Sequence, residues 1–312
     1  MSAPATPTAT IRVNDLSKRY GRQQAVDRLT FAVNAGQVCA LLGPNGAGKT
    51  STMRMLVGLS TPDTGTALIA GDPVSLGAPV LRRVGVLIDG PAFVPHLSGT
   101  KNLKLLWAAA RQTWPPPGLN DALDLAGLGT AIDRKVKSYS MGMKQRLMLA
   151  QALMRVPEVL ILDEPANGLD PAEVRALREH LAALSKAGTT VLVSSHQLAE
   201  VQQLATHIVV MNRGRLISAG PLADVLGGST GTYRIQPDDL DRALAILRDA
   251  PGVTAAAAHN GEVIVTAPTV PASDLVNVLV TAHVGVIAAN PAHQSLEDAY
   301  LAMTGGHDLA AR

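Results

Sequence analysis

The sequence predicts an α/β fold with a mostly parallel sheet, followed by a smaller α+β domain near the C-terminus. Over residues 11–228, short apolar runs alternate with longer amphipathic segments. Apolar runs without polar alternation are typical of buried central strands. Beyond a Gly-rich stretch at 226–229, strand and helix signals follow in a different order. We therefore expect a first domain at 11–228 and a second at 229–312, behind a disordered tail at 1–10.

Strands and helices of the first domain are expected to alternate along the chain. The apolar runs that predict strands are 38–42, 84–87, 159–162 and 191–195. The segments that predict helices are 49–58, 99–113, 141–154 and 172–187. This repetition favours parallel strands, because each helix returns the chain to the same edge of the sheet. The strand-poor stretch at about 90–157 predicts a helical subdomain.

The second domain has a β-α-β-β-α-β order of signals, which predicts a small ferredoxin-like unit. The predicted strands are 233–236, 253–259, 262–266 and 284–288, and the predicted helices are 238–249, 272–283 and a closing 295–303. Asn260-Gly261 lies between two strand signals and predicts a two-residue hairpin turn. Asp238 is expected near a helix N-cap.

Composition narrows the function classes. The 312 residues are 47% apolar and 17% charged, with 27 Lys and Arg against 25 Asp and Glu. This balance, with 3% aromatic residues, argues against nucleic acid as a partner, since phosphate binding needs a basic face. No stretch reaches 18 apolar residues, so we expect no membrane span. The single cysteine, Cys39, is expected to be buried and is consistent with a reducing compartment.

A phosphate-binding loop is the strongest functional signal. The motif G-x-x-x-x-G-K-[ST] lies between a predicted strand and a predicted helix, as its chemistry requires. Backbone N–H groups of such a loop surround phosphate oxygens, Lys49 is expected to reach the β- and γ-phosphates, and Thr50 to bind Mg²⁺. The predicted nucleotide-binding residues of the loop are Gly43, Pro44, Asn45, Gly46, Ala47, Gly48, Lys49, Thr50 and Ser51. No N-K-x-D sequence for reading guanine is present, which favours ATP.

Two acids follow the predicted strand at 159–162. Asp163 is expected to contact Mg²⁺, and Glu164 to polarise the water that attacks the γ-phosphate. An apolar run that ends in two acids is weak evidence alone, but it is strong evidence downstream of a phosphate-binding loop.

A family resemblance rests on four further segments. Tyr139-Ser140-Met141-Gly142-Met143-Lys144-Gln145-Arg146 resembles the signature motif of ATP-binding cassette (ABC) ATPases. Asn167-Gly168-Leu169-Asp170 resembles the D-loop of that family, and His196 its switch histidine. Tyr20 lies where the family stacks an aromatic ring on adenine. The resemblance covers residues 11 to about 226 and implies a P-loop ABC ATPase core.

The resemblance implies an ATPase that uses ATP and Mg²⁺, with Lys49, Glu164 and His196 as catalytic residues. It also implies a homodimer in which Ser140, Gly142 and Met143 hold the γ-phosphate bound by the other copy, with Asp170 in the D-loop beside them. The expected partners are membrane-spanning permease subunits on a separate chain. The expected location is the cytoplasm, peripheral on the inner face of the cell membrane.

Two features resemble the ATPases of bacitracin, lantibiotic and multidrug-resistance exporters. Asp89 stands where most family members have Gln, and we expect it to touch Mg²⁺ or its water. Residues 295–301 resemble the closing segment of these proteins. Efflux of a drug, antibiotic or lipid-like substrate is the leading interpretation, and a soluble ABC-type ATPase acting on nucleic acid or ribosomes is the alternative. For the second domain, dimerisation or regulation, ligand sensing and an inert scaffold stay open.

Overall fold

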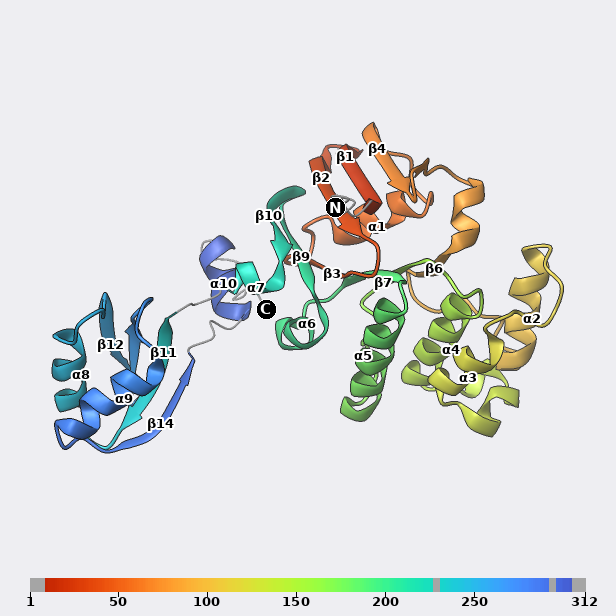
Figure 1. The fold of residues 1–312 in the computed structure, drawn as a ribbon. Coiled ribbons are helices and arrows are strands. Elements are labelled where there is room, and N and C mark those ends of the chain that lie inside the picture. The colour runs from red at the N-terminus through yellow and green to blue at the C-terminus, as the bar shows by residue number, and fades with distance from the viewer. Residues whose placement is uncertain (1–8, 227–230, 292–295, 305–312) are drawn as a thin grey trace, which may run out of the picture. The chain divides into compact units, whose positions relative to one another are not determined.

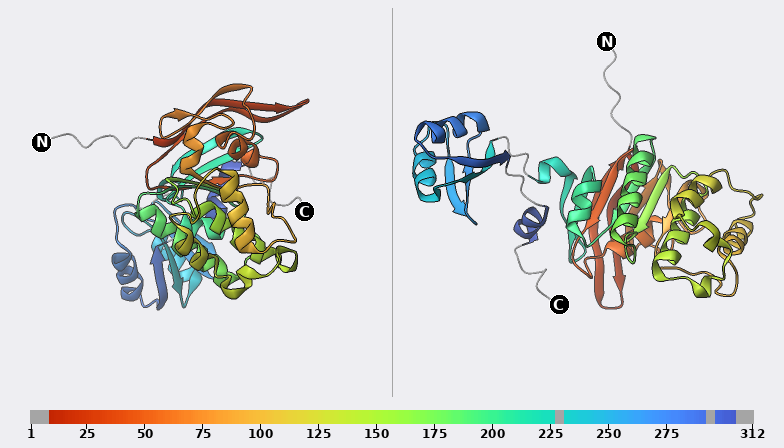
Figure 2. Two further views of the ribbon diagram at one scale, coloured as in Figure 1. Left: turned by 90° about the vertical axis from the view of Figure 1, so that its right-hand side faces the viewer. Right: turned by 90° about the horizontal axis from the view of Figure 1, so that it is seen from below.

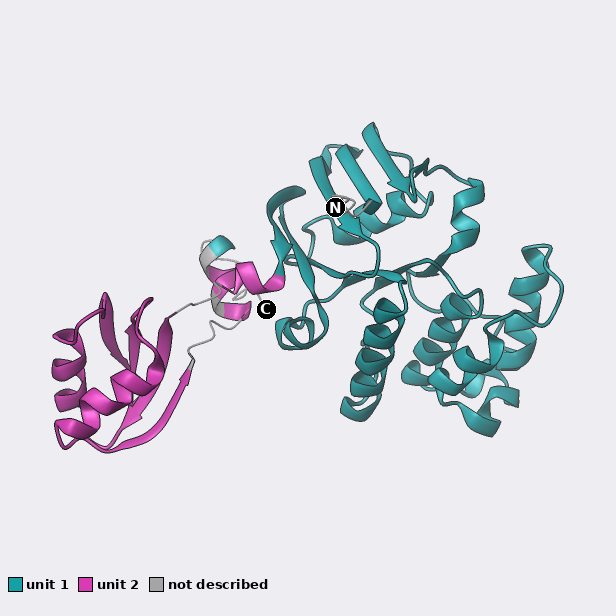
Figure 3. Cartoon of the chain, viewed as in Figure 1, with its two compact units in different colours: residues 1–221, 303–312 teal, residues 222–302 magenta. Residues whose placement is uncertain are grey.

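The computed structural model describes residues 9–226, 231–291 and 296–304 (Figure 1). The chain forms two compact units, residues 1–221 with 303–312 and residues 222–302, which are described separately below (Figure 3). The predicted tail lies outside the described residues except for Ala9 and Thr10, which begin a strand instead. Most of the predicted linker at 226–229 also lies outside them.

A six-stranded sheet in the order β10-β9-β3-β8-β7-β6 forms the centre of the larger unit. Its strands are β3 (Val38–Leu42), β6 (Val84–Leu87), β7 (Val159–Asp163), β8 (Thr190–Ser194), β9 (His207–Asn212) and β10 (Arg215–Pro221). All neighbours are parallel except β9 and β10, which pair antiparallel. Every residue of β3 and β8 is buried, as the absence of polar alternation predicted. The predicted α/β fold with a mostly parallel sheet is confirmed.

A second, antiparallel sheet was not predicted. Its order is β2-β1-β4-β5, with β1 (Ala9–Tyr20), β2 (Gln23–Asn34), β4 (Thr64–Ile69) and β5 (Asp72–Pro73). Apolar side chains of both sheets share one core, which includes Ile11 of β1, Val33 of β2 and Leu41 of β3. The register between β1 and β2 shifts at several points, including one between Val13 and Leu16. These shifts break the two-residue alternation that reveals an amphipathic strand.

The helices of the larger unit are α1 (Lys49–Leu56), α2 (Gly99–Ala109), α3 (Leu119–Ala126), α4 (Met141–Leu153), α5 (Pro171–Lys186) and α6 (Leu198–Leu204). Four of them, α1, α2, α4 and α5, overlap the predicted segments, α3 lies in the stretch expected to be helical, and α6 was not predicted. Helices α2, α3 and α4 group together, as the predicted helical subdomain requires (Figures 1 and 2). Three short 3₁₀ turns connect elements at Pro79–Arg83, Gly129–Asp133 and Val136–Ser138.

The smaller unit contains the four-stranded antiparallel sheet β12-β13-β11-β14. Its elements are α7 (Leu222–Val225), β11 (Thr232–Pro237), α8 (Leu240–Arg248), β12 (Ala255–His259), β13 (Glu262–Thr266), α9 (Ala272–Thr281) and β14 (Val286–Pro291). Helix α10 (Leu296–Thr304) begins in this unit, and its last two residues belong to the larger unit. The strand and helix order from β11 to β14 is the predicted ferredoxin-like order. Ile235, Val263 and Leu279 belong to its core.

Two local details of this unit refine the expectations. Helix α8 begins at Leu240, two residues after the predicted bound of 238, since Asp239 caps it by accepting a hydrogen bond from Arg242 N. The Asp238 carboxylate instead accepts a hydrogen bond of 2.9 Å from Gly285 N. The hairpin turn has φ of 49° at Asn260 and 81° at Gly261, as a type I′ turn requires. No helix in residues 9–226, 231–291 and 296–304 is long and apolar enough to cross a membrane.

Candidate nucleotide-binding site

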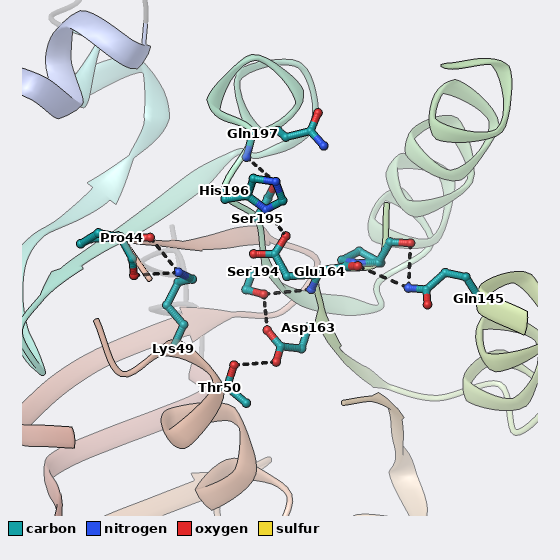
Figure 4. Close-up of polar contacts among 12 residues, drawn as sticks. Pro44, Lys49, Thr50, Gln145, Asp163, Glu164, Ser194, Ser195, His196 and Gln197 are labelled. Atoms are coloured by element: carbon teal, nitrogen blue, oxygen red, sulfur yellow. Dashed lines mark hydrogen bonds and ion pairs between the residues drawn. The ribbon is translucent and has the colours of Figure 1, made fainter. Parts of the chain in front are cut away.

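Five of the predicted functional residues, Lys49, Thr50, Asp163, Glu164 and His196, gather at one edge of the six-stranded sheet (Figure 4). Strands β3, β8 and β7 are neighbours and parallel, so their carboxyl ends meet at this edge. The phosphate-binding loop follows β3, Asp163 ends β7, and His196 follows β8. Because these segments are far apart in sequence, only the strand order brings them together.

Glycine is required at two positions of the loop by close backbone contacts. A Cβ atom on Gly43 would lie 2.4 Å from the Met211 carbonyl oxygen, and one on Gly48 would lie 2.3 Å from the Ala25 carbonyl oxygen. Gly48, with φ of 102°, precedes the first residue of α1, where the N-terminal end of the helix favours an anion. The loop therefore has the close-packed, turned backbone of a phosphate site.

Lys49 lies inside the loop. Its Nζ donates hydrogen bonds to the carbonyl oxygens of Gly43 at 2.7 Å and Pro44 at 3.1 Å. Burial lowers the pKa of Lys49, and the nearby Glu164 and Asp163 carboxylates partly oppose that shift. Its ammonium is thus held at the centre of the loop, where phosphate oxygens would be bound.

Asp163 is held by two hydroxyl groups. Thr50 Oγ1 donates to Asp163 Oδ2 at 2.7 Å, and Ser194 Oγ donates to Asp163 Oδ1 at 2.5 Å. Hydroxyl and carboxylate oxygens are the ligands that Mg²⁺ prefers, so Thr50 and Asp163 fit the predicted metal site. Ser194 was not predicted. Its only signal in the sequence is a polar residue at the end of an apolar strand.

The side chains of Glu164 and His196 form a hydrogen-bonded pair. His196 Nδ1 lies 2.7 Å from Glu164 Oε2, and Glu164 N donates to Ser194 Oγ at 2.9 Å. Gln145 Nε2 donates to the carbonyl oxygens of Glu164 at 3.3 Å and Pro165 at 3.1 Å. The His196 contact holds the Glu164 carboxylate and the other contacts hold the backbone beside it, which makes this carboxylate a candidate to accept a proton from an attacking water. Gln145, on α4, was not predicted to support this residue.

A cavity of about 470 Å³ lies at this edge. The lining residues are Tyr20, Gln23, Ala25, Asn45, Gly46, Ala47, Gly48, Lys49, Thr50, Ser51, Arg54, Asp163 and Glu164. Tyr20 is 44% exposed, and its hydroxyl is 3.2 Å from Ser60 Oγ. The cavity thus brings the predicted adenine-stacking residue together with the loop and both acids.

The predicted signature and D-loop residues lie outside this cavity. Within the described part of the chain, the residues lining this cavity do not include Ser140, Gly142, Met143 or Asp170. Ser140 caps α4, since its Oγ accepts a hydrogen bond of 3.1 Å from Met143 N. Asp170 caps α5, with its carboxylate accepting from Glu173 N at 2.9 Å.

Gly142 packs against the predicted D-loop. A Cβ atom on Gly142 would lie 2.5 Å from the Gly168 carbonyl oxygen, so only glycine fits without movement. Arg146 of the signature segment and Glu173 of α5, the helix that follows the D-loop, add an ion pair of 3.3 Å. The signature segment and the D-loop therefore form one packed surface.

Asp89 is paired with an arginine. Its carboxylate accepts hydrogen bonds from Arg54 Nε at 3.1 and 3.0 Å and from Arg54 Nη2 at 2.5 Å. Arg54, in the last turn of α1, was not predicted as a site residue. The expected contact between Asp89 and Mg²⁺ remains a prediction.

The parallel sheet, the phosphate-binding loop after β3, and the acidic pair after β7 define a P-loop ATPase with a helical subdomain. Comparisons identify the family. The sequence model described as "ABC transporter" matches residues 26–167. An uncharacterized ABC transporter ATP-binding protein of Bacillus subtilis, YhcH, is 36% identical over 298 residues, which cover 95% of this chain and 96% of that protein. The chain belongs to the ATP-binding proteins of ABC transporters, a family that hydrolyses ATP.

Further relatives agree with this assignment. The bacitracin transport ATP-binding protein BcrA of Bacillus licheniformis is 32% identical over 299 residues, covering 95% of this chain and 97% of that protein. A solved ATP-binding subunit of an ABC transporter superposes with a TM-score of 0.64 at 30% identity, covering 70% of this chain and 92% of that one.

Proposed function

We propose that this chain is the ATP-hydrolysing subunit of an exporter whose membrane-spanning subunits are separate chains. The proposal is supported by relatives that are named for bacitracin transport and for drug resistance. One is BcrA. Another is the daunorubicin/doxorubicin resistance ATP-binding protein DrrA of Streptomyces peucetius, 40% identical over 227 residues, which cover 70% of this chain and 67% of that protein. The substrate class is accordingly a drug, antibiotic or lipid-like compound, and the location is the cytoplasmic face of the membrane.

The contact of 2.7 Å between Glu164 and His196, beside Lys49, carries the catalytic part of this proposal. Glu164 accepts a proton from the attacking water, and His196 orients the Glu164 carboxylate. Lys49 binds the β- and γ-phosphates through its ammonium. Thr50 and Asp163 hold Mg²⁺, which neutralises charge on the phosphates when bound.

A pair of chains completes the site in this proposal. The support is that Ser140, Gly142 and Met143 lie outside the cavity of their own chain, at the start of α4. In a head-to-tail pair, this helix start faces the γ-phosphate held by the other copy and binds it through N–H groups and the helix dipole. We assign the smaller unit a dimerisation or regulatory role.

Replacement of Glu164 by glutamine tests the catalytic assignment. Glutamine keeps the size of the side chain but cannot accept the proton, so phosphate release should fall about 100-fold or more while ATP binding persists. The matched control is Glu158→Gln, because Glu158 precedes β7 directly and pairs with Arg83 away from the cavity. The control should retain turnover.

The two measurements are phosphate release and ATP binding by the purified chain. Full turnover in Glu164→Gln would refute the role of Glu164. Size-exclusion chromatography of the same variant with ATP should show a dimer, and co-purification with a multi-span membrane protein tests the exporter assignment.

A further inference from the structure

Arg54, which lines the nucleotide cavity, forms an ion pair with Asp89. Both nitrogens of one guanidinium edge contact the carboxylate, at 3.0 Å from Nε to Oδ2 and 2.5 Å from Nη2 to Oδ1. The two side chains are 41% and 42% exposed. The pair is therefore bidentate in geometry but open to solvent, so exchanging its partners requires little free energy.

The two residues belong to different parts of the ATPase unit. Arg54 lies in the helix that begins at Lys49, and it lines the nucleotide cavity together with Lys49 and Asp163. Asp89 lies between β6 and α2, at the entry to the helical subdomain. The ion pair thus connects the phosphate-binding helix with the start of the helical subdomain.

The backbone turns sharply at Asp89. Asp89 has φ of 69° and Gly90 has φ of 78°, so two consecutive residues adopt the left-handed conformation. Asp tolerates this conformation better than most residues, at some cost. The guanidinium of Arg54 satisfies the side chain of the residue that makes this turn.

We propose that Arg54 is a positioning residue that holds the Asp89 carboxylate and releases it to Mg²⁺ when the nucleotide binds. The Arg54 guanidinium places a positive charge against both carboxylate oxygens, and this charge repels a metal cation, so Arg54 and Mg²⁺ compete for Asp89. This inference rests on the proposed contact between Asp89 and Mg²⁺.

The test is a Mg²⁺ titration that does not depend on turnover. The full chain carrying Glu164→Gln is loaded with a fluorescent ATP analogue, and the Mg²⁺ concentration at half-saturation is read from the fluorescence. Arg54→Gln removes the competitor and should lower this concentration about two- to five-fold, as expected for loss of an exposed ion pair. Asp89→Asn should raise it, and adding Arg54→Gln to Asp89→Asn should produce no further change.

Two additional variants separate this role from a general effect of charge. Arg54→Lys keeps the positive charge without the bidentate contact, and it should give a shift smaller than that of Arg54→Gln. Arg83→Gln is the matched control, since Arg83 pairs with Glu158 through the same two kinds of nitrogen at 2.7 and 2.5 Å, outside the cavity. It should leave the half-saturation concentration unchanged.

The outcomes separate this inference from the proposed function. Arg54→Gln can shift the Mg²⁺ concentration at half-saturation equally in the chain that has Asp89 and in the Asp89→Asn variant. That result would show that Arg54 does not act through Asp89, and it would overturn the inference. An unchanged half-saturation concentration in Asp89→Asn would overturn it as well, because it would show that Asp89 does not contact Mg²⁺. In both cases, analogue binding to the Glu164→Gln chain would leave the ATPase assignment intact.

Discussion

Replacing Gly142 by alanine is expected to destabilise the ATPase unit, although alanine is the better helix former. Position 142 lies in the first turn of α4, where alanine gains about 1 kcal/mol over glycine. The added Cβ would lie 2.5 Å from the Gly168 carbonyl oxygen, whereas an ordinary C···O contact is about 3.3–3.6 Å. Because the opposing atom is backbone, the chain must shift, and overpacking of this kind costs about 2–3 kcal/mol. The net loss is about 1–2 kcal/mol.

Thermal unfolding followed by circular dichroism measures this effect. For a unit of this size, 1 kcal/mol corresponds to about 2–4 °C, so the melting temperature should fall by about 2–8 °C. Gly220→Ala is the matched control, because a Cβ atom there meets no atom within 4 Å, and it should melt at or slightly above the wild-type temperature. A Gly142→Ala variant that melts at or above the wild-type temperature would refute the assigned packing of α4 against the D-loop.

Two further predictions concern other parts of the chain. Burial raises the pKa of the Cys39 thiol to about 12, so a thiol reagent at pH 8 should modify Cys39 only at the rate of unfolding; rapid labelling of the native protein would contradict this. Asn260→Ala should lower the stability of the smaller unit in urea by about 1 kcal/mol, because Asn260 has φ of 49°, while Asn260→Gly should be close to neutral. Equal stability of these two variants would argue against the type I′ turn.

Strands, loops and turns whose sequence pattern lies within a few consecutive residues were predictable. Strand β3 and the loop after it were predictable because a buried strand, a Gly-rich turn and a helix start follow each other within a few residues. The hairpin between β12 and β13 was predictable because Asn-Gly is a local turn signal. By contrast, the register shifts of β1 hid its alternation, and the antiparallel sheet was missed.

Some residues of the candidate site were predictable from local motifs, and others were not. Lys49, Thr50, Asp163 and Glu164 stand in short motifs whose residue types follow from phosphate and metal chemistry. Ser194 has no motif of its own, and its contact with Asp163 exists because β8 lies beside β7. Such supporting contacts depend on which strands are neighbours, and that order is a property of the whole domain.

By itself, the sequence predicted a loop that binds nucleotide phosphates and an acid that polarises a water, because both tasks need particular residues at fixed short spacings. Only the tertiary structure decided that Arg54 holds Asp89 and that Gly142 packs on Gly168. These contacts join segments separated by 35 residues in the first case, and by the strand β7 in the second. Their geometry is set by close packing across the domain, which no local pattern of residues records.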